Sequence, residues 1–156
     1  MLGGRQLGGG RRGSIGTKPA AGNFSDSKES AARKYLDANC GYCHNPNGFA
    51  ASSGLHLDLR EMNERRLGFC KTPVAAPMPE EWGVFDIEPR EPSRSLVVRR
   101  MMSMDPLFAM PELGRSSIDV RGVAIVSGWI SELQGSCDDV VRGSDRPDSS
   151  SEGLDG

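Results

Sequence analysis

Two cysteines and a histidine stand within five consecutive residues, Cys40-Gly41-Tyr42-Cys43-His44, and this segment constrains the chain more than any other feature. Thiols at this spacing lie on one side of a helical turn, where both can add to the vinyl groups of one porphyrin. The adjacent histidine can then bind the iron from one axial side. The pattern therefore predicts one covalent c-type haem, attached through Cys40 and Cys43 and ligated by His44.

The same spacing has other uses. A C-x-x-C pair also binds zinc, and Cys70 or Cys137 could supply a further ligand beside Cys40, Cys43 and His44. The alternative to a haem protein is thus a zinc-stapled interaction domain. Thiol exchange of the thioredoxin type fits less well, because that motif follows a strand and here a helix is predicted before the motif.

Three helices are predicted. Asp26 and Glu29 have the spacing of a capping box, and residues 27–39 follow as a helix that leads into the motif. A second helix is predicted over residues 94–102 and a third, with a broad apolar surface, over residues 118–134.

The intervening segments are predicted to be irregular. The chain contains 20 Gly and 10 Pro, and many of them interrupt residues 45–54 and 70–92, which excludes long helices there. Between them, residues 55–59 alternate apolar and polar side chains, which is typical of a short strand.

The two ends differ in charge from the middle of the chain. Residues 1–22 carry four basic side chains and no acid, whereas residues 138–156 carry six acids against two arginines. We expect residues 1–24 to be a disordered Gly/Arg-rich linker or a misannotated start, and residues 138–156 to be a disordered acidic tail. A formal net charge of -2 and a basic end without aromatic residues argue against a nucleic-acid partner.

No apolar run is long enough to cross a bilayer, and the first residues lack the apolar stretch of a secretory signal. We therefore expect no stable membrane insertion. Haem is normally attached to C-x-x-C-H outside the cytoplasm, so the motif predicts a periplasmic or other extracytoplasmic location. The two observations together suggest a fragment, a misplaced start codon or the end of a larger exported protein.

Several separated features resemble a class I cytochrome c domain of the kind found in bacterial multi-domain secreted proteins. They are the helix entering C-G-Y-C-H, the N-P-N-G turn after it, the M-P-E-L-G segment at 110–114 and a last helix containing W-I-S-E-L. The resemblance covers residues 25–137. It implies an all-α, cytochrome c-like fold with three main helices and long irregular loops around one haem, with the first and last helices crossing near a haem edge through Tyr35 or Leu36 and Trp129. The two long Pro-rich loops depart from the compact family pattern.

The resemblance also implies a methionine as the second axial ligand of the iron. Met110 precedes Pro111 just ahead of the last helix, where the family's ligand loop returns across the haem. Met78 also precedes a proline and is the nearest competitor. His56 is the second histidine of the chain, and it is expected to be a surface or core residue.

Axial ligation by His44 and Met110 would leave no open position on the iron, which favours single-electron transfer over catalysis. Beyond the motif, no nucleophile with its base is evident. The expected partner is a redox protein or a catalytic domain of a larger redox enzyme.

Cys70 and Cys137 lie outside the motif. An oxidising compartment favours a disulfide between them, and two free, buried thiols are the alternative.

Overall fold

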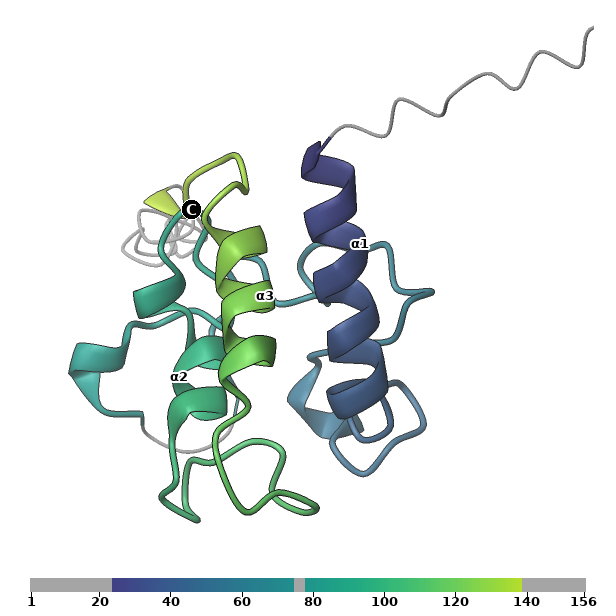
Figure 1. The fold of residues 1–156 in the computed structure, drawn as a ribbon, viewed down its shortest axis with the longest axis vertical. Coiled ribbons are helices and arrows are strands. Elements are labelled where there is room, and N and C mark those ends of the chain that lie inside the picture. Colours follow the sequence, from purple (N-terminus) through teal and green to yellow (C-terminus); the bar gives the residue numbers. More distant parts are fainter. Residues whose placement is uncertain (1–23, 75–77, 139–156) are drawn as a thin grey trace, which may run out of the picture.

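The computed structural model describes residues 24–74 and 78–138, and the fold of this part is built on three α-helices (Figure 1). They are α1 (Phe24–Leu36), α2 (Leu96–Met102) and α3 (Val120–Ile130), and α3 lies between the other two. A π-helical turn at Asp37–Gly41 extends α1, and short 3-10 turns lie at Ala51–Ser53, Glu80–Trp82 and Pro92–Arg94. The described residues contain no strand, only isolated bridges between Phe69 and Ile87 and between Phe85 and Ser95. The expected all-α class is confirmed.

The three helices occur where the sequence predicts them, with shifted ends. α1 begins at Phe24, ahead of the proposed capping box, so Asp26 lies within the helix. The last residues of the predicted first helix belong to the π-helical turn. α3 is shorter than predicted and begins after Asp119, whose Oδ1 accepts the N–H groups of Arg121 and Gly122 at 3.0 and 2.9 Å. Capping of these free amide groups explains why the helix starts at Val120.

The strand predicted at residues 55–59 is wrong. The N–H of His56 donates to Arg66 and that of Leu57 donates to His44, so consecutive residues bond to different segments and no ladder forms. Burial does not alternate either, because Leu55, His56 and Leu57 are all buried, whereas Leu59 is exposed. The five residues whose apolar and polar side chains alternate belong to a loop that crosses the core.

The core lies where α1, α2 and α3 meet the loops that precede α2. It contains Ala32, Leu36, Leu55, Leu57, Ile87, Val97, Val98, Met101, Val126, Trp129 and Ile130. α1 lies close to α3 at Gly122, where an added Cβ would lie 2.1 Å from Cζ of Tyr35. The Tyr35 hydroxyl donates to Oδ2 of Asp119 at 3.1 Å, so the residue that caps α3 also binds α1.

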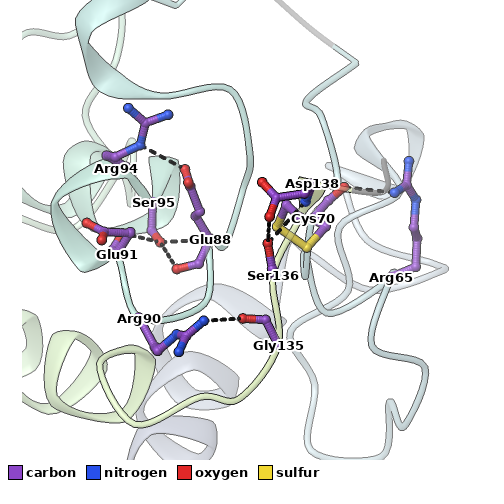
Figure 2. The surroundings of a disulfide bond; sticks show 11 residues. Arg65, Cys70, Glu88, Arg90, Glu91, Arg94, Ser95, Gly135, Ser136 and Asp138 are labelled. Carbon is purple, nitrogen blue, oxygen red and sulfur yellow. Dashed lines mark hydrogen bonds and ion pairs between the residues drawn. A yellow bond between two sulfur atoms is a disulfide. The ribbon is translucent and has the colours of Figure 1, made fainter. Parts of the chain in front are cut away.

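A disulfide joins Cys70 to Cys137 across a sequence separation of 67 residues (Figure 2). It fastens the segment after α3 to the loop before α2. Nearby, Arg65 donates to the Cys70 carbonyl at 2.7 Å and Arg90 donates to the Gly135 carbonyl at 3.1 Å. The pairing is the one that the sequence favours for an oxidising compartment.

Replacing both Cys70 and Cys137 with serine is expected to lower the free energy of unfolding by roughly 4 kcal/mol, because the unfolded chain regains the freedom of a long closed loop. Urea unfolding followed by circular dichroism measures the change. Wild-type protein treated with a reductant should lose a similar amount. Equal midpoints for oxidised and serine-substituted protein would show that the crosslink does not contribute to stability.

No helix in the described ranges is long and apolar enough to span a membrane. The proposed linker and acidic tail lie almost wholly outside the described residues. The described helices all fall within the domain expected at residues 25–137 or at its border.

Candidate functional site

The C-x-x-C-H segment lies at the carboxyl end of the first helix. The N–H groups of Cys43 and His44 both donate to the Cys40 carbonyl, at 3.1 and 2.8 Å. Asn45 closes the turn by donating from Nδ2 to the carbonyls of Gly41 and Tyr42 at 2.7 and 2.9 Å. Cys40 and Cys43 are not in a disulfide and are each partly exposed. One compact turn therefore presents two thiols and an imidazole.

The Cys40 thiol is held in its protonated form. Burial, with the neighbouring Cys43 as a smaller cause, raises the pKa of Cys40 to about 11. Thiols that carry out disulfide exchange have lowered pKa values, since the thiolate is the nucleophile. The electrostatics of Cys40 thus disfavour the thiol-exchange interpretation of the motif.

His44 is neutral at neutral pH and its ring is held from one side. Burial lowers its pKa, while a backbone hydrogen bond with Leu55 acts in the opposite direction. Nδ1 lies 3.4 Å from the Ser53 hydroxyl, and the His44 carbonyl accepts the N–H of Leu57 at 2.8 Å. The contact of Ser53 with Nδ1 orients the ring, and a ring fixed through Nδ1 would ligate a metal through Nε2.

Met110 is half-buried, and its backbone is held at both ends. Its N–H donates to the Arg100 carbonyl at 3.1 Å, and its carbonyl accepts from Nη1 of Arg115 at 2.8 Å. The same guanidinium donates to the carbonyls of Met101 and Ser103. Arg115 therefore ties the Met110 loop to the end of α2.

Met78 lies in the same region, because its sulfur is 3.6 Å from Nη2 of Arg100. The charge of Arg100 also lowers the pKa of His44. Both candidate methionines thus contact Arg100 of α2, Met78 through its sulfur and Met110 through its backbone N–H. Of the three methionines on or beside this helix, Met101 is buried in the core, while Met102 and Met104 are about half exposed.

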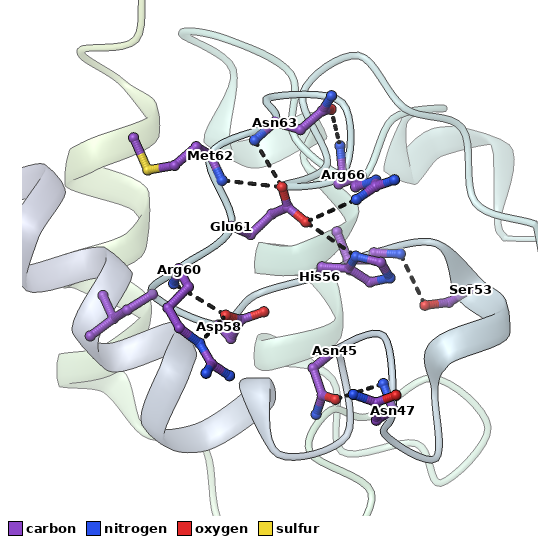
Figure 3. A network of polar contacts seen from close by, with 12 residues as sticks. Asn45, Asn47, Ser53, His56, Asp58, Arg60, Glu61, Met62, Asn63 and Arg66 are labelled. Carbon is purple, nitrogen blue, oxygen red and sulfur yellow. Dashed lines mark hydrogen bonds and ion pairs between the residues drawn. The ribbon is translucent and has the colours of Figure 1, made fainter.

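His56 belongs to a separate polar network centred on Glu61 (Figure 3). Its Nδ1 lies 3.3 Å from Oε2 of Glu61, and both side chains are 11% exposed. The carboxylate also accepts the N–H groups of Met62 and Asn63 at 3.1 and 2.9 Å. His56 orders a loop here, in agreement with the core role expected for it.

The zinc alternative finds little support in the arrangement of the donors. Both cysteines that could have supplied a further ligand, Cys70 and Cys137, form the disulfide. Within residues 24–74 and 78–138, no three His, Cys, Asp or Glu side chains are grouped so as to hold a metal ion. A zinc site with a third cysteine would need the disulfide to open.

Two buried side-chain donors, Nε of Arg33 and Nε1 of Trp129, have no hydrogen-bond partner in the part of the chain that the structure describes. The Trp129 ring packs edge-on against Phe69 at 5.7 Å between centroids. The half-buried guanidinium of Arg100 contacts the Met78 sulfur and forms no salt bridge among the described residues. Buried donors normally find an acceptor, so the Trp129 indole and the Arg100 guanidinium fit a ligand that carries carboxylates, as haem does.

Comparison of the chain with protein-family models, curated proteins and solved structures gives no match. The C-x-x-C-H motif and the contacts around it are therefore the features that bear on function.

Proposed function

We propose that residues 25–137 form a class I c-type cytochrome domain that carries one covalent haem and transfers single electrons. The observation that carries the proposal is the C-x-x-C-H turn, in which two unbonded thiols and a neutral, oriented imidazole come from five consecutive residues. The bonding of the other two cysteines to each other leaves this pair free for another use.

Each residue of the site has a distinct role in the proposal. Cys40 and Cys43 would hold the porphyrin as thioethers, His44 would ligate the iron through Nε2, and the Met110 sulfur would ligate it from the other side. Bound in this way, haem supplies an iron that alternates between ferrous and ferric states. The close contact of α1 with α3 supports the pairing of first and last helices that the family resemblance implies.

The protein's own contacts would keep the His44 and Met110 side chains in place beside a bound haem. Ser53 and Leu55 hold the His44 ring, and Arg115 holds the Met110 loop against α2. A site that changes little between oxidation states needs little reorganisation. We propose further that the domain acts outside the cytoplasm and exchanges electrons with a redox protein or a catalytic domain.

Electron transfer without catalysis is tested by redox titration of the protein secreted through a haem-maturation system. We expect a reversible one-electron couple, and a ferrous form that binds no carbon monoxide because both axial positions are filled. Rapid binding of carbon monoxide by the native protein would contradict the carrier function and indicate an open iron position.

A further inference from the structure

Lys71 and Asp86 form an ion pair that the proposed electron-transfer role does not yet use. Nζ lies 2.8 Å from Oδ2, and each side chain is only 10% exposed. Nζ also donates to the Thr72 carbonyl at 3.3 Å, and the Asp86 N–H donates to the Lys71 carbonyl at 2.7 Å. A pair so deeply buried gains little net stability, because desolvation offsets most of the attraction between the charges. Its presence calls for another explanation.

The pair lies directly behind the segment that orients His44. Ser53 faces Nδ1 of His44, and a Cβ added at the next residue, Gly54, would lie 3.5 Å from Cε of Lys71. A Cβ added at Gly68 would lie 2.9 Å from Cδ1 of Leu55 and 3.0 Å from Cβ of Asp86. The stem of Lys71 therefore lies beside the residue between Ser53 and Leu55, and Leu55 and Asp86 both lie next to Gly68.

The two charges act on His44 in opposite directions. The Asp86 carboxylate favours positive charge at His44, whereas the Arg100 guanidinium and the Lys71 ammonium disfavour it. The groups that face Asp86 are the cationic side chains of Lys71 and Arg100 and the neutral imidazole of His44. In a poorly solvated site such charges are weakly screened, so they also act on any metal bound to the histidine.

We propose that Lys71 and Asp86 set the reduction potential of the haem held by His44, acting as a fixed pair of opposed charges next to the axial ligand. The inference rests on the proposed function. Reduction adds one electron to the iron and lowers the charge of the site by one. The carboxylate therefore stabilises the ferric state and lowers the potential, and the ammonium stabilises the ferrous state and raises it.

The test uses Asp86→Asn, Lys71→Met and the double variant in the full-length, haem-loaded protein. Removal of the carboxylate is expected to raise the potential, and removal of the ammonium to lower it. Each shift should correspond to about a tenfold change in electron affinity, or ~59 mV for a one-electron couple. Lys71→Met is compared with wild type on the alkaline side of neutrality, because burial raises the pKa of Asp86 and its carboxylate must stay charged in the comparison.

The signs of the two shifts in reduction potential distinguish electrostatic tuning from structural damage to the His44 segment. Mere loosening of the His44 segment would move both variants in the same direction, whereas tuning moves them in opposite directions and leaves the double variant between them. Arg94→Gln is the matched control, because Arg94 pairs with Glu88 at 3.1 Å but is 55% exposed. It should leave the potential unchanged, since solvent screens an exposed charge.

Shifts of the same sign, or no shift in either variant, would overturn the inference while haem remains attached. If Asp86→Asn is not secreted, the comparison of Lys71→Met with the double variant still tests the inference. The double variant also lacks the carboxylate, so its reduction potential must be higher than that of Lys71→Met. A wild-type protein without haem would instead refute the proposed function, and that result is visible before any variant is made.

Discussion

Met110→Ala is expected to lower the reduction potential by on the order of 100 mV and to open one axial position of the iron. A thioether favours the ferrous state, so its loss shifts the couple toward the ferric state. The ferrous protein should then bind carbon monoxide, and the sulfur-to-iron charge-transfer band of the ferric protein should disappear. Redox titration and absorbance spectroscopy measure all three effects.

Met78→Ala is the matched control for this substitution. Both sulfurs belong to methionines that lie around Arg100, and Met78 contacts its guanidinium directly. Among the hydrogen bonds of the described residues, Arg115 donates to the carbonyl of Met110 and not to that of Met78, so the Met110 loop is the better anchored of the two. We expect Met78→Ala to keep the charge-transfer band and to exclude carbon monoxide. The reverse result would assign the second axial position to Met78.

Gly122→Ala is expected to destabilise the fold by about 3 kcal/mol, independently of any cofactor. The added methyl group would lie 2.1 Å from Cζ and 2.2 Å from Oη of Tyr35, so the ring must leave the α1–α3 contact. Overpacking of this kind costs about 1–3 kcal/mol, and the hydrogen bond from Tyr35 to Asp119 is lost with it. Urea unfolding measures the change.

Gly128→Ala in the same helix is the control, because an added Cβ meets nothing within 4 Å there. Removing a glycine from a helix interior should stabilise the protein by about 0.5–1 kcal/mol. A second readout is the Tyr35 phenol, whose pKa is raised to about 12 by burial and by the bond to Asp119. In Gly122→Ala this pKa should fall toward its ordinary value. If both glycine variants were equally stable, the close contact of α1 with α3 would be wrong.

Local sequence patterns predicted the features that depend on residues close together in the sequence. The three helices follow from apolar periodicity, and the compact turn at Cys40 follows from the spacing of its cysteines. The alternation at residues 55–59 misled, because a buried loop also places apolar side chains next to polar ones when hydrogen bonds satisfy them. His56 is such a case, buried against Glu61.

Apart from the Cys70–Cys137 disulfide, the long-range contacts could not be predicted from one sequence. Nothing in the spacing of Lys71 and Asp86 indicates that they meet beside the His44 segment, because loops without periodicity bring them together. The same holds for Arg115, whose side chain joins the Met110 loop to the end of α2. The sequence did not distinguish Gly122 from other helix glycines, because its close neighbour Tyr35 lies on another helix.

The central claim is that Cys40 and Cys43 hold haem covalently, and mass spectrometry of denatured protein tests it most directly. The full chain is secreted behind an export signal in cells with haem-maturation machinery, and the wild type is compared with Cys40→Ala/Cys43→Ala. The account predicts that the wild type keeps the mass and absorbance of one haem after denaturation and that the double variant keeps none. A correctly exported wild type that is colourless and has only the mass of the polypeptide would contradict it.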